Sequence, residues 1–321
     1  MLLSTSHYAV SLDSADAAEF HFVSHAHTDH TKGVRNNSAL LSSEITKEFL
    51  EAKGKRNIST IKSPYGVKLL NAGHILGSKQ IFIEDYDLGY SIVYTGDYQV
   101  EDPLLAEKIE IENADVLIID STYAYEGFAF DNKEEVITAM QHYAAQKLNK
   151  GSVLFSAYSL GRAQELIKIY NDAGIIPLTD AEIARMSEVY KRHGIRLCFD
   201  VYDAANVQRD NFVGIFSGRR LAEVSSLLSR QGRRAYTAVA TGWARITRFN
   251  TNVQFAITDH ATFDQALQYI ELASPRLIFT TGTNSAAMAA RLKNKGYEAK
   301  DLGKLAEKRV IPMANFALQK T

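Results

Sequence analysis

The chain of 321 residues carries a formal net charge of −1, and 46% of its residues are hydrophobic. This composition is that of an ordinary soluble globular protein, and it argues against a polyanion binder that is basic along its whole length. The single cysteine, Cys198, excludes a disulfide framework and a cysteine-rich zinc cluster, and it favours a reducing, cytoplasmic location.

The N-terminus, MLLSTSHYAVSLD, has no basic stretch and no long apolar run, so we expect neither a signal peptide nor a membrane anchor.

The first third of the chain contains short apolar runs between glycine-bearing turns. The runs are rich in β-branched residues, which predicts buried strands, each with a polar residue at its C-terminal end. The predicted strands cover residues 20–25, 67–74, 80–85, 90–97 and 115–120.

The middle of the chain changes character, and the early pattern returns near the end. Helix, strand and helix are predicted at residues 132–148, 151–158 and 161–173, which is an α/β pattern. Late in the chain we predict strands at 252–260 and 276–282 and helices near 262–273 and 284–296. We therefore expect one domain divided in the sequence, with a second α/β lobe inserted into it. The expected parts are residues 1–124, 125–253 and 254–321.

The stretch HAHTDHTKG at residues 25–33 predicts a metal site directly after a buried strand. Alternate residues of an extended segment point the same way, so His25 and His27 can converge on one ion. Asp29 and His30 can reach a second ion nearby. Imidazole and carboxylate groups suit zinc, with manganese or iron as rivals.

Two further polar residues, His74 and Asp97, follow predicted strands, and each comes directly after a glycine that allows a sharp backbone turn. A carboxylate between two ions can bridge them, and this is the role that we assign to Asp97. Zinc lowers the pKa of a bound water to about 7, so the pattern predicts a hydrolase.

These residues resemble the defining pattern of the metallo-β-lactamase superfamily. The pattern HxHxDH stands here as His25, His27, Asp29 and His30, and His74 and Asp97 follow it. The superfamily hydrolyses thioesters, lactams and lactones as well as phosphodiesters, so this motif alone does not identify the substrate.

Further stretches resemble the β-CASP nucleases, especially the DNA cross-link-repair group of Artemis and Apollo and the ligase-associated and archaeal exonucleases. The resemblance runs from VSLD at residues 10–13 to residues 291–303. It implies an α/β fold, the metallo-β-lactamase αββα sandwich, with an inserted α/β β-CASP domain. The stretches are DSTY (120–123), AYSLGRAQELI (157–167), ATGWA (240–244) and TDHATFDQAL (258–267).

The resemblance implies roles for two residues outside the metal pattern. Asp120 matches an acid that lies close to the metal ligands, where a carboxylate can orient a ligand histidine. His260 matches a histidine near the scissile phosphate, where it can donate a proton to the leaving oxygen or stabilise charge. Without the resemblance, His260 is equally well explained as a structural histidine.

The third family motif departs from the pattern. Thr281 stands where the RNA-processing members have a metal-binding histidine and the DNA-repair members usually have valine. Threonine is a poor zinc ligand, so the second metal is expected to have only Asp29, His30 and Asp97. We therefore expect one well-held ion and a second ion that is weakly held or absent. The missing histidine favours DNA over RNA.

The middle of the chain also offers candidate nucleic-acid contacts. Between Ser217 and Phe249 there are seven arginines and one acid, Glu223, and arginine pairs bidentately with phosphate. A solvated helix face explains some of these arginines equally well. Among the seven, the candidate nucleic-acid contacts are Arg219, Arg220, Arg233 and Arg234.

The turn before the helix predicted at residues 161–173 is a candidate phosphate site. Ser159, Gly161 and Arg162 stand there, where backbone N–H groups and the helix dipole favour an anion. In the resembling repair nucleases, a serine and a basic residue at this turn contribute to a pocket for a terminal 5′-phosphate. The turn type is common, so the motif alone is weak.

The leading hypothesis is a metal-dependent phosphodiesterase, and more specifically a 5′-directed DNA exonuclease of DNA repair. The alternatives are an RNA-processing nuclease of the same family and a small-molecule hydrolase, such as a lactonase or thioesterase. A third alternative is a non-catalytic nucleic-acid-binding subunit, against which the complete HxHxDH set argues. We expect DNA or RNA as the substrate and no membrane partner, and the sequence leaves the oligomeric state open.

Overall fold

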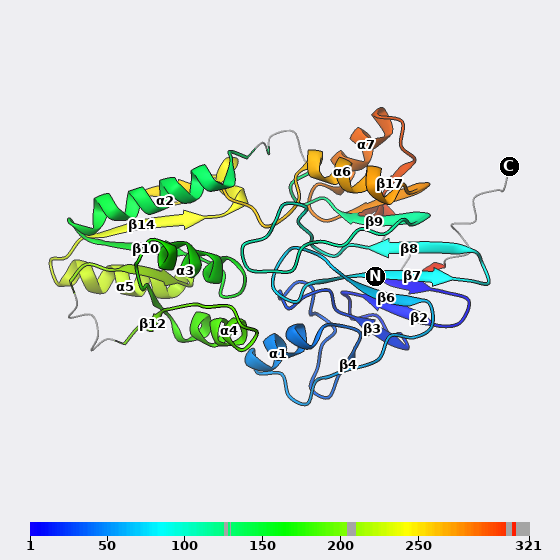
Figure 1. Cartoon of the computed structure of the whole chain (residues 1–321), viewed down its shortest axis with the longest axis horizontal. Helices are drawn as coiled ribbons and strands as arrows, with labels where there is room; N and C mark the ends of the chain where they lie inside the picture. The colour runs from blue at the N-terminus through cyan, green and yellow to red at the C-terminus, as the bar shows by residue number, and fades with distance from the viewer. Residues whose placement is uncertain (125–127, 129, 204–209, 306–309, 313–321) are drawn as a thin grey trace. The chain divides into compact units, whose positions relative to one another are not determined.

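The computed structural model describes residues 1–124, 128, 130–203, 210–305 and 310–312. The chain divides into two compact units, which are colour-ramped along the sequence in Figure 1. Unit 1 comprises Met1–Glu126 and Asp259–Thr321, and unit 2 comprises Gly127–Thr258. Within the described residues there is no helix that is both long enough and apolar enough to span a membrane.

Unit 1 contains two main sheets with helices. Its first segment has β1 (Leu2–Ser4), β2 (Ala9–Leu12), β3 (Phe20–Phe22), β4 (Ala39–Leu40), α1 (Glu44–Ala52), β5 (Ser59–Thr60), β6 (Val67–Asn71), β7 (Lys79–Asp85), β8 (Tyr90–Tyr94) and β9 (Val116–Asp120). Its second segment has α6 (Phe263–Ala273), β16 (Leu277–Thr281), α7 (Ser285–Asn294), β17 (Ala299–Asp301), α8 (Leu302–Leu305) and β18 (Val310–Pro312).

The two main sheets of unit 1 pack face to face. One sheet has the strand order β18-β1-β2-β3, and the other has the order β17-β16-β9-β8-β7-β6. Leu3, Phe22 and Ile118 belong to the buried core between the two sheets. Helices α6 and α7 cover the other face of the larger sheet, where Phe263 and Met288 join its core (Figure 1). Strands β4 and β5 form a separate pair, next to α1.

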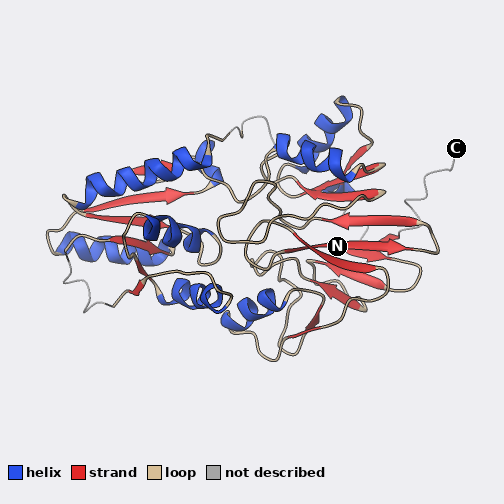
Figure 2. Ribbon diagram, in the orientation of Figure 1, coloured by secondary structure: helices blue, strands red, loops and turns tan. Residues whose placement is uncertain are grey.

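Unit 2 is a six-stranded sheet with helices between its strands, as the colours of Figure 2 show. All its pairings are parallel, in the order β12-β11-β13-β10-β14-β15. Its elements are α2 (Lys133–Leu148), β10 (Ser152–Ser156), α3 (Arg162–Asp172), β11 (Leu178–Thr179), α4 (Ala181–Arg192), β12 (Asp200–Val201), β13 (Val213–Phe216), α5 (Gly218–Arg230), β14 (Ala235–Ala240), the 3-10 helix η2 (Gly242–Arg245) and β15 (Val253–Phe255).

The predicted α/β class is confirmed, and the predicted elements are present, with every predicted strand shorter except that at residues 80–85, which is β7 (Lys79–Asp85). The strand predicted at residues 20–25 ends at Phe22, because the backbone N–H of Ser24 donates to the Asp13 carboxylate instead of to a neighbouring strand. The strand predicted at 252–260 ends at Phe255, and His260 lies in the segment before α6. Helix α6 begins where predicted, with a capping box between Thr262 and Gln265.

Candidate metal centre

Four strands of the larger sheet in unit 1 end at the same edge. β8, β9 and β16 are parallel neighbours, and β6 runs in their direction because two antiparallel pairings separate it from β8. Asp120 and Thr281 are the last residues of β9 and β16, while His74 and Asp97 lie three residues beyond β6 and β8. The common strand direction therefore gathers these four residues at one edge of the sheet.

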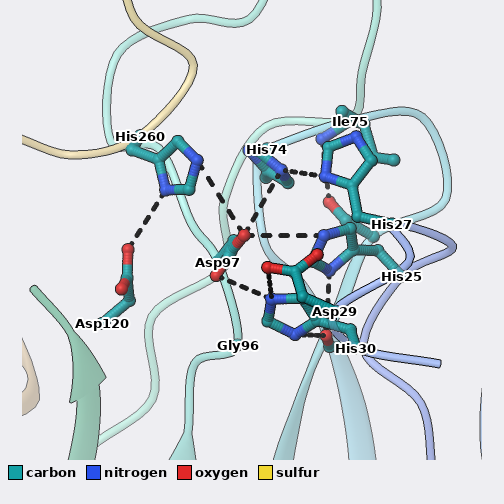
Figure 3. A network of polar contacts seen from close by, with 12 residues as sticks. His25, His27, Asp29, His30, His74, Ile75, Gly96, Asp97, Asp120 and His260 are labelled. Carbon is teal, nitrogen blue, oxygen red and sulfur yellow. Dashed lines mark hydrogen bonds and ion pairs between the residues drawn. The ribbon is translucent and has the colours of Figure 1, made fainter. Parts of the chain in front are cut away.

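Four of the predicted metal ligands form a compact cluster (Figure 3). His25, His27, His74 and Asp97 each offer one ligand atom, and these atoms lie within 4.8 Å of one another. His74 Nε2 is 3.2 Å from His27 Nδ1, and Asp97 Oδ2 is 3.5 Å from His25 Nε2 and 3.7 Å from His74 Nε2. Tetrahedral zinc with bonds of about 2.0–2.1 Å separates its ligands by roughly 3.3–3.5 Å. The cluster therefore fits a tetrahedral ion.

The ligand nitrogen of His25 has no hydrogen-bond partner among the described residues, although Asp97 Oδ2 lies 3.5 Å away. Its Nε2 is buried and makes no hydrogen bond there. A buried polar atom without a partner is costly, and coordination to a metal would satisfy it. Burial and the neighbouring His30 and His27 hold the pKa of His25 well below its usual value, which keeps the ring neutral, as a ligand must be.

Hydrogen bonds fix the tautomers of His74 and His25. His74 Nδ1 donates to the carbonyl oxygen of Asp259 at 2.9 Å, which leaves Nε2 as the free base. The Ser24 hydroxyl donates to Asp13 Oδ2 at 2.6 Å, so the 2.9 Å bond between Ser24 Oγ and His25 Nδ1 takes its proton from the histidine. In both rings the nitrogen that faces the cluster is therefore free to bind a metal.

His30 lies on the other side of Asp97 and is held by the same Asp13. Its Nδ1 is 2.7 Å from Asp13 Oδ2, and its Nε2 is 3.3 Å from Asp97 Oδ1 and 3.6 Å from Asp29 Oδ2. Burial lowers the pKa of His30, but the carboxylates of Asp97 and Asp13 outweigh burial and raise it to about 12. The Asp29 side chain is 72% exposed, so this second group is more open than the first.

The two oxygens of the Asp97 carboxylate face different groups. Oδ2 faces His25 and His74, while Oδ1 faces His30. Burial raises the pKa of Asp97, but His30 and His260 outweigh it and hold the pKa well below its usual value. Asp97 is thus an ionised carboxylate between the two groups of candidate ligands, in the position that a bridging ligand needs.

Asp120 contacts His260, and among the described residues no hydrogen bond or ion pair joins it to His25, His27 or His74. Its Oδ2 is 3.1 Å from His260 Nδ1, and its Oδ1 accepts from the backbone N–H and the hydroxyl of Thr122. His260 Nε2 points back to Asp97 Oδ2, 3.9 Å away. Burial lowers the pKa of His260, but Asp97 and Asp120 outweigh burial and raise it to about 9.

Two glycines permit the close approach of the segments that carry His74 and Asp97. Gly73 has a φ of +76°, and a Cβ there would lie 2.3 Å from the carbonyl oxygen of Gln99. Gly96 has a φ of +55°, and a Cβ there would lie 2.6 Å from Ser24 Cβ. A side chain at either position would push apart the backbone segments that hold the cluster.

Thr281 lies at the same edge as Asp120, its partner in the pairing of β16 with β9. Its carbonyl oxygen accepts from the backbone N–H and the hydroxyl of Ser121. The expectation of a weak second ion stays a prediction.

The predicted phosphate turn in unit 2 is largely occupied by its own residues. The backbone N–H of Gly161 donates to Gln164 Oε1, and the Ser159 hydroxyl donates to Glu182. Arg162 is buried, pairs with Glu165 and donates to the carbonyl oxygen of Ile257. The side chain of Arg162 is thus committed to interactions inside unit 2, and a phosphate role for this turn stays a prediction.

The four arginines of unit 2 that are candidate nucleic-acid contacts are exposed or partly exposed. Arg219 and Arg220 stand in the first turn of α5 and pair with Glu223. Arg233 donates to the carbonyl oxygen of Asp210, and Arg234 is exposed. Part of this positive charge is therefore neutralised locally, as expected for a solvated helix face.

Sequence reasoning missed three groups that hold the cluster. These are Asp13, Ser24 and the carbonyl of Asp259, and Asp13 also accepts from the Tyr94 hydroxyl at 3.0 Å. Asp13 has a φ of +47°, a left-handed conformation that is uncommon outside glycine and is enriched at functional sites. An acid at the end of VSLD was visible in the sequence, but its partners were not.

Comparisons with known proteins identify the family of the chain. The chain is 27% identical to the "Probable DNA ligase" of Opitutus terrae over 88% of this chain and 28% of the relative. It is 40% identical to the "RNase J-like protein" of Methanocaldococcus jannaschii over 33% of this chain and 25% of the relative. The chain belongs to the β-CASP family of the metallo-β-lactamase superfamily.

Two other comparisons concern the fold and the family models. A solved structure of a protein of unknown function from Enterococcus faecalis has a TM-score of 0.57 and 14% identity, and the match covers 87% of this chain and 78% of that one, which supports the fold alone. No family model matches the chain. The chain spans only about a quarter of the length of the two curated relatives.

Proposed function

We propose that the protein is a metal-dependent phosphodiesterase that acts on nucleic acid, and more specifically a 5′-directed DNA exonuclease of DNA repair. The observation that carries this proposal is the position of Asp97, between the cluster of His25, His27 and His74 on one side and His30 on the other. Hydrolases of phosphate esters commonly use a carboxylate in this position. Membership of the β-CASP family and the similarity to a probable DNA ligase and to an RNase J-like protein support nucleic acid as the substrate.

The residues of unit 1 suggest a division of labour. When bound, a divalent ion supplies Lewis-acid activation of water and of the phosphoryl oxygens. The three clustered histidines and Asp97 would hold the ion, and the hydrogen bonds from His74 and His25 to Asp259 and Ser24 keep the ligand nitrogens deprotonated. These bonds orient the ligands before substrate arrives.

His260 is the residue that we assign to the leaving oxygen. Asp120 receives the bond from Nδ1, so Nε2 faces the candidate metal cluster beside Asp97. A histidine held in this way can donate its Nε2 proton to the departing alkoxide or stabilise charge on the phosphate. Asp120 acts through His260 and is therefore a positioning residue.

We further propose zinc in the well-formed cluster, DNA in preference to RNA, and unit 2 as the inserted β-CASP domain. The four donor atoms and their spacing suit tetrahedral zinc, and manganese is the main rival. The threonine at position 281, where RNA-processing members have a histidine, supports DNA. The parallel sheet of unit 2 and its arginines support a domain that holds the strand.

The central test measures nuclease activity and zinc content together. Wild-type protein, Asp97→Asn and His260→Asn are incubated with labelled single-stranded DNA or RNA that has a 5′-phosphate or 5′-hydroxyl, in defined zinc or manganese. We expect Asp97→Asn to lose both zinc and activity. We expect His260→Asn to keep zinc and to lose about 10²- to 10⁴-fold in kcat. The exposed His142→Asn is the matched control and keeps both.

The same assay separates the alternatives. A lactone and a thioester are added to the substrates, and their turnover without cleavage of either nucleic acid would replace the phosphodiesterase proposal. Cleavage of RNA but not DNA would reverse the DNA preference. Release of internal fragments would show that the enzyme is an endonuclease and not an exonuclease. Unchanged activity in Asp97→Asn would overturn the metal mechanism.

A further inference from the structure

Two loops of unit 1 lie side by side next to the candidate metal centre. One follows the metal motif, at residues 31–38, and the other follows α1, at residues 53–62. The backbone N–H of Asn37 donates to the carbonyl oxygen of Arg56 at 2.9 Å, and that of Arg56 donates to Asn36 Oδ1 at 2.9 Å. Strands β4 and β5 extend this contact in parallel register. The two loops therefore form one continuous surface element.

One lysine fastens this surface element to the metal motif, and a second lysine joins its two loops to each other. Lys53 Nζ donates to the carbonyl oxygen of Ala26 at 2.6 Å, and Ala26 stands between His25 and His27. Lys55 Nζ donates to the carbonyl oxygen of Val34 at 2.8 Å. The second loop is thus anchored directly to the backbone that presents the ligands.

The surface element is strongly basic. The two loops contain six lysines and arginines and no aspartate or glutamate. Four of these cations are exposed, and among the described residues none of the four forms an ion pair with a carboxylate. We call these four the basic rim: Lys32, Arg35, Arg56 and Lys62. In contrast, Arg219 and Arg220 of unit 2 both pair with Glu223.

We propose that the basic rim binds the phosphate backbone of a nucleic-acid strand whose scissile bond lies at the metal centre. This inference rests on the proposed phosphodiesterase function, and it adds a binding surface on unit 1 itself. Lys32 stands two residues after His30, so the rim begins beside the metal motif. Unpaired cations gain from phosphate contact by releasing the counterions of the strand.

The composition of the rim indicates contacts to the backbone of the strand and not to its bases. Asn36, Asn57 and Ser59 are exposed between the cations, and amide and hydroxyl groups bind phosphate and sugar oxygens. Among the described residues 1–124, the only exposed large aromatic side chain close to these segments in the sequence is Tyr65, which lies beyond the second loop. The rim is therefore expected to bind strands of different sequence with similar affinity.

The test compares two triple variants that each remove three exposed cations from unit 1. The rim variant is Lys32→Ala, Arg35→Ala and Arg56→Ala. The matched control is Arg276→Ala, Lys293→Ala and Lys295→Ala; these residues are exposed, before β16 or at the C-terminal end of α7, away from the edge that carries Asp120. Both are made in the Asp97→Asn background, which prevents cleavage, and melting temperatures confirm that they fold.

Binding of a labelled 20-nucleotide single strand is measured by fluorescence anisotropy at several salt concentrations. Three lost phosphate contacts should weaken binding on the order of 10- to 100-fold at low salt and reduce the slope of log affinity against log salt by about 2. The control should keep the affinity and slope of the parent. An unchanged affinity and slope in the rim variant would overturn the inference.

A small substrate separates this inference from the proposed function. With Asp97 restored, the rim variant and the wild type are assayed on bis(p-nitrophenyl) phosphate, which is too short to reach the rim. We expect equal turnover of this substrate and slower cleavage of the oligonucleotide. If the wild type cleaves neither substrate, the phosphodiesterase proposal fails, whereas the anisotropy experiment still decides whether the rim binds nucleic acid.

Discussion

Asp13 accepts a hydrogen bond from His30 Nδ1 at 2.7 Å, across 17 residues of sequence. The same carboxylate oxygen accepts a hydrogen bond from the Ser24 hydroxyl, and the Ser24 oxygen in turn accepts one from His25 Nδ1. One acid therefore sets the orientation and the tautomer of histidines on both sides of Asp97.

We predict that Asp13→Asn lowers zinc affinity and activity by about 10- to 100-fold, the usual cost of removing a carboxylate that orients a metal ligand. Asparagine tolerates the positive φ of this position, so the change tests the charge and not the backbone. Zinc affinity is measured by competition with a chromogenic chelator. Ser24→Ala is the comparison, because it removes the link to His25 and leaves the bond to His30. Wild-type zinc affinity in Asp13→Asn would contradict the positioning role.

Removing metal should destabilise unit 1, because the ligand nitrogen of His25 is buried and has no hydrogen-bond partner among the described residues. Zinc at 100 times its Kd should stabilise the folded state by about 2.7 kcal/mol relative to chelated protein. Calorimetry with a chelator and then with excess zinc measures the difference in melting temperature. His142→Asn should retain the zinc response, and Asp97→Asn should lose it. A wild-type protein that melts at the same temperature in both conditions would exclude a metal site in this cluster.

Arg162→Ala should destabilise unit 2 by about 3–5 kcal/mol, because it leaves Glu165 charged and buried without its partner. The side chains of Arg162 and Glu165 are only 6% and 10% exposed. Replacing both, as Arg162→Met with Glu165→Leu, should recover most of the loss, and urea unfolding measures all three. If Arg162 instead binds the substrate phosphate, Arg162→Ala will raise KM and leave the free energy of unfolding unchanged.

Asp85 should contribute to stability only above acid pH. Burial raises the pKa of Asp85, but bonds from Ser6 and from the backbone of Leu88 and Asp87 outweigh burial and lower the pKa below its usual value. A lowered pKa means that the contribution is complete above the unfolded value of about 3.9 and is lost as pH falls through the folded value.

The variant Asp85→Asn should therefore lower the free energy of unfolding at pH 7 by about 1–3 kcal/mol, the worth of hydrogen bonds to a charged group. This difference from wild type should shrink as the pH falls below about 4. Urea unfolding in the presence of a chelator measures it without a contribution from metal release. A difference that stays constant from pH 7 to pH 3 would show that the charge of Asp85 plays no part.

Local patterns in the sequence predicted much of the fold and the candidate ligands. HAHTDHTKG is recognisable because its residues are adjacent, and the runs that became β6 to β9 are apolar and short. His74 and Asp97 could be found because each follows a strand and a glycine. The strand direction that brings them together is a property of the sheet, and one sequence alone does not specify it.

The rest depended on contacts between distant residues. The hydrogen bond of His74 goes to a backbone carbonyl, which every residue has, so no residue type in the sequence could indicate Asp259. The turn at Gly161 has the composition of an anion site, but Gln164, Glu165 and Glu182 satisfy its donors in the folded chain. The unpaired cations of the basic rim became visible only when two loops about twenty residues apart were found to be hydrogen-bonded to each other.

The bond from His74 to Asp259 has a consequence for the synthesis of the protein. The two partners are 185 residues apart, with all of unit 2 between them. The ribosome therefore releases all the candidate metal ligands well before it adds the carbonyl that sets the tautomer of His74. Strand β9 likewise has no β16 beside it at that stage. A nascent chain at that stage has the metal-binding motif but lacks Asp259 and His260, so the candidate centre can be completed only after all of unit 2 has been synthesised.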